Sequence, residues 1–405
     1  MRLPTQTVTL GGSAYRVTVE IEPDPSVPPV VVPPVVTPPT GTGYTAKAGK
    51  LYDAGVEFQI RGINLSGFQA WDTRRPTSLW NSGWKWQIAH AKEMGFNAFR
   101  LPIEPGVLHS PETMPGKSTL LMPDNSDLVG KTPLQVLDLW MEEAERMEMR
   151  VLIDMHSVSG HSLYFHPYIT DPNDYAGWAA TWNKQSYTRA NWLRDLVIIA
   201  DRYKNLKCFM GIDPFNEPHD RIRWSPDGNP IHAFWKPLIE DAYKSISATN
   251  PNLLIFVEGI TRNDWSGKEK DVPINWGENL QPQTYAPLAI PSEKLVFSPH
   301  TYGPPDHMKS TFSADNYPEN LAADWETLFG YLSPQFAVVP GEWGGNYSND
   351  AEKKWLNAWV DYMSSKGIRS SFYWNYINSE KPDALVRNDL TVRKDVLAVI
   401  QRHWG

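Results

Sequence analysis

Residues 208–219 read "CFMGIDPFNEPH", a short apolar run that ends on an acid placed between an amide and a proline. A run of this length and apolar content is typical of a buried β-strand. A proline restricts the residue before it to extended geometry, so we expect Glu217 to keep a strand-like conformation where the chain leaves the sheet. Glu217 is therefore a candidate for a carboxylate aimed at a substrate, and the amide of Asn216 can donate to a substrate hydroxyl.

Seven further apolar runs with strand character accompany this one along the chain. Amphipathic stretches typical of helices separate most of them, whereas residues 260–293 look irregular. Eight strands alternating with helices predict an α/β fold, a closed (β/α)8 TIM barrel, with a doubly wound open sheet as the alternative. The predicted strands are 58–64, 96–103, 150–156, 208–215, 252–259, 294–300, 336–343 and 369–375, and the predicted helices are 82–94, 133–148, 188–203, 231–249, 319–330, 351–366 and 392–402.

The chain before residue 44 has a different organisation. Residues 5–22 alternate apolar and polar residues on both sides of Gly11-Gly12, which predicts an N-terminal β-hairpin segment over 1–22. Residues 23–43 are rich in proline and predict an extended linker before a catalytic barrel over 44–405. Because one hairpin alone is marginal in water, we expect this hairpin to dock on a partner surface.

Composition limits the classes of partner. The net charge of −8, from 46 acidic and 38 basic residues, argues against a nucleic-acid partner. No apolar stretch of 18 residues occurs, so no membrane-spanning helix is expected, and the N-terminus lacks the apolar core of a signal peptide. The single cysteine, Cys208, excludes an internal disulfide. The 18 tryptophans and 17 tyrosines suit core packing or stacking platforms for sugar rings.

The predicted strands end on polar and aromatic residues that a barrel would gather at one mouth. Each has an ordinary structural explanation by itself, but the whole set is harder to explain by core packing. Glu217 and Glu342 form the pair of carboxylates that glycoside hydrolysis requires, at about 5–5.5 Å for retention and further apart for inversion. His156, His161 and His166 lack the spacing of a helical zinc motif, so we expect no metal and no cofactor. The residues at the strand ends are Asn64, Arg100, His156, Asn216 with Glu217, Glu258, His300 with Tyr302, Glu342 and Trp374.

Six segments, "FNAFRLP", "DMH", "FNEPH", "SPHTYGP", "GEWGG" and "FYWN", occur in an order that resembles glycoside hydrolase family 5, the clan-A retaining cellulase family of (β/α)8 barrels. The resemblance covers most of residues 44–405. The segments "TMPGKSTLL", "NPNLLIFVEG" and "NWGENLQ" are similar to the bacterial and archaeal endo-β-1,4-glucanase branch of that family. The resemblance to the family also suggests a cis peptide between Trp374 and Asn375.

The resemblance implies a role for each residue of the mouth. Arg100 beside Glu342 is expected to lower the pKa of the nucleophile, whereas burial and a nearby carboxylate raise that of Glu217. The implied roles are acid/base for Glu217, nucleophile for Glu342, binding of the 2-hydroxyl for Asn216, orientation of Glu342 for Arg100 and Tyr302, contact with Glu217 for His300, lining of the same subsite for His156, and the floor under the sugar for Trp374. Further candidates for substrate contact are Asn64, Trp71, Trp80, Trp276 and Tyr376.

Departures from the family pattern lie around the subsites. They include Leu65, Ser157 and the segment "NYINSEKPDA" after Trp374. The resemblance implies an extracellular, monomeric enzyme that cleaves internal β-1,4-glucosidic bonds of a β-glucan polysaccharide. The departures keep open the same mechanism on mannan, xyloglucan or another β-glycan. A non-catalytic carbohydrate-binding or attachment protein, suggested by the hairpin and linker, is the alternative from another class.

Overall fold

The chain divides into two compact units, Met1–Val36 and Thr37–Gly405, which are described separately. Among the described residues, no helix combines the length and the apolar character that crossing a bilayer requires. The structure, a computed structural model, describes residues 6–10, 13–17, 43–70, 72–114, 122–156, 179–180, 185–186, 189–219, 222–228, 233–261, 268–304, 309–377 and 383–405.

In the first unit, β1 (Gln6–Leu10) and β2 (Ser13–Val17) pair antiparallel with Val8 opposite Tyr15. This pairing confirms the predicted hairpin. The predicted turn at Gly11-Gly12 and nearly all of the linker lie outside the described residues. The exact domain boundaries and the docking partner of the hairpin stay predictions.

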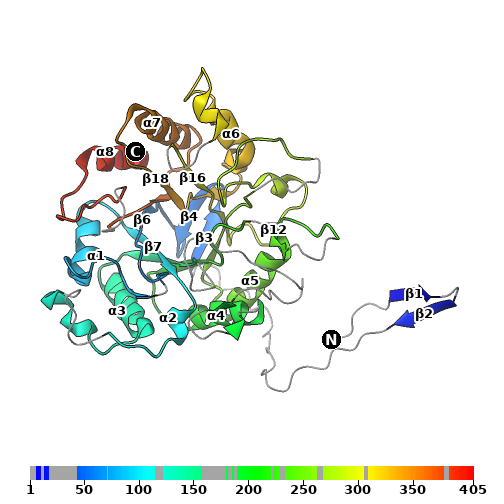
Figure 1. The fold of residues 1–405 in the computed structure, drawn as a ribbon, viewed down its shortest axis with the longest axis horizontal. Coiled ribbons are helices and arrows are strands. Elements are labelled where there is room, and N and C mark those ends of the chain that lie inside the picture. Colours follow the sequence, from blue (N-terminus) through cyan, green and yellow to red (C-terminus); the bar gives the residue numbers. More distant parts are fainter. Residues whose placement is uncertain are drawn as a thin grey trace. The chain divides into compact units, whose positions relative to one another are not determined.

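The second unit is a barrel of parallel strands ringed by helices (Figure 1). The barrel has eight strand positions. Two of them are each filled by two consecutive short strands: β15 is followed by β16, and β17 is followed by β18. The strand at the eighth position pairs with the strand at the first, with Tyr373 opposite Ile63. The ring of strands therefore closes, and the open-sheet alternative is wrong. In order around the barrel, the strands are β6 (Arg61–Asn64), β7 (Ala98–Ile103), β8 (Arg150–Met155), β11 (Phe209–Asp213), β14 (Leu254–Val257), β15 (Leu295–Phe297) with β16 (His300–Tyr302), β17 (Ala337–Val338) with β18 (Glu342–Gly344), and β19 (Ser371–Tyr373).

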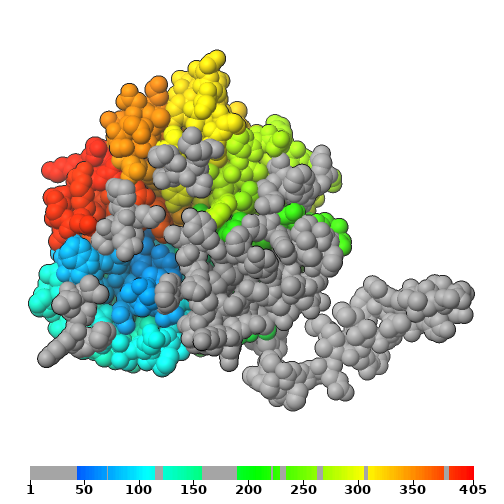
Figure 2. Space-filling view, in the orientation of Figure 1, coloured from blue at the N-terminus to red at the C-terminus, as the bar shows by residue number. Residues whose placement is uncertain are grey.

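All seven predicted helices are present around the barrel, and on its surface the colours run in chain order around the unit (Figure 2). In the predicted irregular region, the described residues form one short 3-10 helix, η2 (Gln281–Thr284). The α-helices are α1 (Trp84–Glu93), α2 (Gly106–His109), α3 (Pro133–Arg146), α4 (Arg189–Arg202), α5 (Trp235–Thr249), α6 (Leu321–Leu328), α7 (Asp350–Ser365) and α8 (Lys394–Trp404). The smaller elements are η1 (Pro123–Leu128), η3 (Ser310–Ser313), η4 (Gly330–Leu332), β9 (Ala179–Ala180), β10 (Gln185–Ser186), β12 (Ile222–Arg223) and β13 (Ala233–Phe234).

A three-stranded antiparallel sheet, formed by β3 (Tyr44–Lys47), β4 (Lys50–Asp53) and β5 (Val56–Phe58), was not predicted. Its buried side chains share one apolar cluster with inward-facing residues of the barrel strands. Its two turns place an alanine and a glycine in succession at positive φ, which suits a tight hairpin. The Ala-Gly pairs at 48–49 and 54–55 were the sequence pattern that could have revealed it.

The larger core lies between the strands and the helices, and α3 shows how the sequence builds it. Thr132 and Gln135 form a reciprocal capping box at its start. Val136, Leu137 and Trp140 then recur at helical spacing and are buried against the barrel. Helix formation and core burial are thus specified by the same short stretch.

We expect Leu137→Ala to lower the free energy of unfolding by about 2–5 kcal/mol, because Leu137 is fully buried and its loss leaves a cavity. Leu134→Ala on the same helix is the matched control: this side chain is only partly buried, so its loss should cost about 1 kcal/mol or less. Urea unfolding followed by circular dichroism measures both. Equal losses in the two variants would contradict the packing described for α3.

Candidate active site

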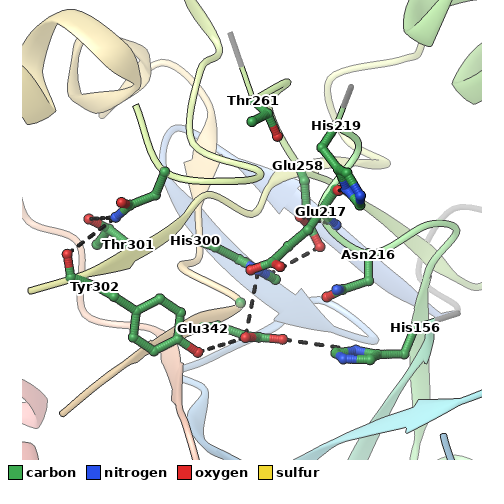
Figure 3. A network of polar contacts seen from close by, with 12 residues as sticks. His156, Asn216, Glu217, His219, Glu258, Thr261, His300, Thr301, Tyr302 and Glu342 are labelled. Carbon is green, nitrogen blue, oxygen red and sulfur yellow. Dashed lines mark hydrogen bonds and ion pairs between the residues drawn. The ribbon is translucent and has the colours of Figure 1, made fainter. Parts of the chain in front are cut away.

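Polar side chains from several barrel strands converge at the carboxyl end of the barrel (Figure 3). Glu342 begins β18, His300 and Tyr302 belong to β16, and His156 directly follows β8. Glu217 lies in the loop after β11. The structure therefore brings both predicted catalytic glutamates to one mouth, as expected for a barrel.

Glu342 is held through both carboxylate oxygens. Arg100 Nη1 donates to its Oε1 at 2.6 Å, and the hydroxyl of Tyr302 donates to its Oε2 at 2.7 Å. The side chain is only 5% exposed, so these two donors fix its orientation away from bulk water. A carboxylate oriented in this way can attack a substrate atom at a defined position.

Arg100 is a fully buried guanidinium at the centre of a larger polar cluster. Its Nη1 donates to Oδ1 of Asn64 at 3.2 Å, and its Nη2 donates to Oδ1 of Asn216 at 3.0 Å. The contact through Oδ1 leaves the amide nitrogen of Asn216 for a substrate hydroxyl. Arg100 Nη2 also lies within 3.3 Å of three buried carboxyls, those of Asp154, Asp213 and Glu258.

The predicted extended conformation of Glu217 is wrong. Its φ is +47°, in the left-handed region that non-glycine residues rarely adopt. One tertiary and one local hydrogen bond accompany this conformation: its N–H donates to Oε2 of Glu258 at 2.8 Å, and its carbonyl accepts from Nδ1 of His219 at 2.6 Å. The effect of Pro218 is therefore outweighed by these hydrogen bonds.

The side chain of Glu217 is 20% exposed, and its Oε1 lies 3.1 Å from Nδ1 of His300. Ligand atoms of Glu217, His300 and Glu342 all lie within 4.8 Å of one another. The two glutamates are thus close enough for charge on one to oppose charge on the other.

Burial raises the pKa of both glutamates. The pKa of Glu217 is raised well above its usual value, first by burial and then by the charge of Glu342. For Glu342, burial is opposed by Arg100, His156 and the hydroxyl of Tyr302. The prediction of a lowered pKa for Glu342 is therefore wrong in sign, because burial outweighs Arg100. The causes of the two shifts still fit the predicted roles, because the charge of Glu342 adds to burial at Glu217, whereas Arg100 and Tyr302 oppose burial at Glu342.

His156 and Trp374 form one wall of the site, with their rings stacked at 5.7 Å between centroids. His156 Nδ1 lies 2.7 Å from Asp154 Oδ2. Burial lowers the pKa of His156 to about 4, so its imidazole is neutral at neutral pH. The peptide between Trp374 and Asn375 is cis, as the resemblance suggests.

The other candidates for substrate contact have mixed outcomes. Tyr376 is fully buried and its hydroxyl lies 3.0 Å from Nδ1 of His90, so its assignment as a sugar platform is wrong. Asn64 is also fully buried and contacts Arg100, so it supports the site instead of binding substrate. Trp276 is partly exposed and stacks on His219, Trp80 is 44% exposed before α1, and Trp71 lies outside the described residues.

Three buried acids were given no role by the sequence reasoning: Asp154, Asp213 and Glu258. Asp154 is the penultimate residue of β8, Asp213 is the last residue of β11 and Glu258 directly follows β14, in "VLID", "MGID" and "LIFVE". An ionisable residue at that position in a buried strand is unusual, and this pattern could have revealed Asp154 and Asp213, whereas Glu258 was already named as a strand-end residue without a role.

The donor atoms of Asp213, Glu258 and His300 lie within 4.8 Å of one another, a separation that a metal ion could bridge. The guanidinium of Arg100 already lies within 3.3 Å of both acids and supplies a positive charge at that place. The donors around Glu217 and Glu342 are those that the substrate would meet. We therefore assign neither group as a metal site.

Comparisons with known proteins agree with this geometry. The chain is 38% identical over 357 residues to the "Major extracellular endoglucanase" of Xanthomonas campestris pv. campestris, covering 87% of this chain and 69% of that protein. It is 28% identical over 369 residues to an "Endoglucanase" of Paenibacillus polymyxa, covering 89% and 87%.

Solved structures give the same result. The catalytic domain of the Xanthomonas endoglucanase superposes with a TM-score of 0.80 at 35% identity, covering 89% of this chain and 99% of that chain. A hyperthermophilic endocellulase of Pyrococcus horikoshii superposes with a TM-score of 0.76 at 26% identity, covering 90% and 99%. The family model described as "Cellulase (glycosyl hydrolase family 5)" matches residues 51–380, from β4 to the segment after β19. With the barrel, the paired glutamates and this match in agreement, the chain belongs to glycosyl hydrolase family 5.

Proposed function

We propose that the protein is a retaining endo-β-1,4-glucanase that cleaves internal bonds of a β-glucan by double displacement. The observation that carries the proposal is the pair Glu217 and Glu342, with carboxylate oxygens within 4.8 Å of each other and unlike surroundings. A short separation favours retention, because no water fits between the second carboxylate and the sugar.

In the first step, Glu342 attacks the anomeric carbon while Glu217 gives its proton to the leaving oxygen. Arg100 and Tyr302 each hold one oxygen of the attacking carboxylate in place. When Glu342 forms the ester, its negative charge is lost. The pKa of Glu217 then falls, because that charge is one of the causes that raise it. Glu217 can therefore act as base and activate the water that releases the sugar.

The assignment of β-1,4-glucan as substrate is supported by the relatives. Both curated relatives are named endoglucanases, and a complex with cellotetraose is known for the endocellulase of Pyrococcus horikoshii, at 26% identity and a TM-score of 0.77. The name of the Xanthomonas relative also supports an extracellular location. Mannan or xyloglucan is the second candidate, because the segment after Trp374 departs from the family pattern in the sequence, whereas the departure at Leu65 is a fully buried core residue.

We expect Glu342→Gln to lower the rate of reducing-sugar release from barley β-glucan and carboxymethyl cellulose by at least about 10⁴-fold, because the nucleophile is lost. Glu217→Gln should lower it by about 10²- to 10⁴-fold and recover on an aryl cellobioside whose leaving group needs no proton. Glu326→Gln, on the outer helix α6, is the control and should keep wild-type activity.

Three outcomes of this experiment would change the account. Cleavage of galactomannan alone would retain the mechanism and replace the substrate. Inversion of the anomeric centre, followed by NMR, would contradict double displacement. No release by the wild type from any β-glycan would contradict the proposed function.

Tyr302→Phe removes the hydroxyl that donates to Glu342, so the ionised nucleophile loses one hydrogen bond. We expect the pKa of Glu342 to rise, because a donated hydrogen bond stabilises the charged form of the carboxylate that accepts it. Because Glu342 must be ionised, the acid limb of kcat/KM should move to higher pH. Tyr331→Phe loses a similar hydroxyl contact, to the carbonyl of Leu280, and should leave the limb in place. An unmoved acid limb in Tyr302→Phe would contradict this role of Tyr302.

A further inference from the structure

Glu258 lies behind the acid/base residue and contacts it in two ways. Its Oε2 accepts the backbone N–H of Glu217 at 2.8 Å, the residue that carries the positive φ. Its Oε1 lies 3.1 Å from Nε2 of His300, whose other ring nitrogen lies 3.1 Å from the carboxylate of Glu217. One side chain therefore reaches both the main chain of Glu217 and the histidine that touches its carboxyl group.

His300 needs a partner at Nε2. The ring is fully buried, and Nε2 makes no hydrogen bond of good geometry with the described residues. A buried polar atom without a partner is costly, and Oε1 of Glu258 lies within hydrogen-bond distance of it, at 3.1 Å. The main chain of Glu258 is fixed by Trp235, whose Nε1 donates to its carbonyl at 2.9 Å.

The charge balance of the cluster decides the protonation state of Glu258. Four carboxyls contact Arg100, so full ionisation would leave three negative charges unbalanced in a buried region. Glu258 has the longest of these four contacts, 3.3 Å. Burial, followed by the charge of Asp213, raises the pKa of Glu258 well above its usual value. The titratable and charged groups that face Glu258 are Arg100 from β7, Asp154 from β8, Asp213 and Glu217 from β11 and the loop after it, and His300 from β16.

We propose that Glu258 is a positioning residue that, as a neutral carboxylic acid, donates its O–H to Nε2 of His300 and so holds the ring proton on Nδ1, where it is donated to Glu217. This inference rests on the proposed function, in which Glu217 is the acid/base. The Nδ1–H can donate to Glu217 before and after Glu217 has given up its proton. The opposite tautomer would place a lone pair against the carboxylate that forms in the transition state.

Two variants of Glu258 separate this role from general packing. Glutamine has an N–H to donate to His300 and a carbonyl to accept from Glu217, so Glu258→Gln reproduces the neutral acid. Leucine has a similar volume and neither group. We expect Glu258→Leu to lower kcat by about 10- to 100-fold, the cost of a hydrogen bond to a charged group, and Glu258→Gln to recover most of that loss.

The pH dependence of kcat/KM distinguishes a neutral from an ionised Glu258, because the two states predict opposite shifts of its alkaline limb. In Glu258→Leu the ionised form of Glu217 loses a donor, so its pKa rises and the alkaline limb of kcat/KM moves to higher pH. In Glu258→Gln the limb should stay at the wild-type pH. If Glu258 is instead ionised, both variants remove a negative charge beside Glu217, so the pKa of Glu217 falls. The alkaline limb of kcat/KM then moves to lower pH in each variant. That result, or equal loss of kcat in the two variants, would overturn the proposal.

A spectroscopic measurement tests the tautomer without any variant of Glu258. In wild-type protein labelled with 15N-histidine, the resonances of His300 are identified by their loss in His300→Asn. We expect a protonated Nδ1 and an unprotonated Nε2 at neutral pH. A protonated Nε2 would overturn the proposal even if Glu258→Leu fails to fold. Because this readout needs no substrate, it stands apart from the proposed function, which fails if the wild type releases no sugar from any β-glycan.

Discussion

The buried guanidinium of Arg100 is the interaction on which the active site depends. Its two terminal nitrogens reach Glu342, Asn216 and three further carboxyls, which come from four different strands or the loops after them. A single cation in this place offsets part of the cost of burying several acids together. Because the guanidinium is rigid and planar, it also fixes the positions of the oxygens that it contacts.

This arrangement divides two chemically identical side chains into different roles. Glu342 shares its charge with Arg100 and with the hydroxyl of Tyr302, whereas Glu217 faces a histidine that is neutral at neutral pH. Burial disfavours ionisation of both, and of the two it is Glu342 that accepts a direct hydrogen bond from Arg100. One carboxyl group is thereby available for attack and the other for proton transfer, as in other pairs whose surroundings separate their pKa values.

Sequence reasoning recovered the barrel, seven of the eight described α-helices and the residues at the mouth, because hydrophobic periodicity and strand ends are local properties. It failed where tertiary contacts override local preference. The positive φ of Glu217 depends on a hydrogen bond to Glu258, which directly follows a different strand, β14. The fully buried state of Tyr376 depends on the packing around α1. The sign of the pKa shift of Glu342 required the balance between burial and Arg100, which a list of residue types does not contain.

The measurement that tests the central claim most directly is trapping of the covalent intermediate. A 2-deoxy-2-fluoro cellobioside with a good leaving group slows the second step more than the first, so a glycosyl-enzyme should accumulate. The account predicts that mass spectrometry of the digested protein finds one fluorocellobiosyl group, attached to Glu342. A label on another residue, or turnover with no covalent adduct, would contradict the assignment of Glu342 as the nucleophile held by Arg100.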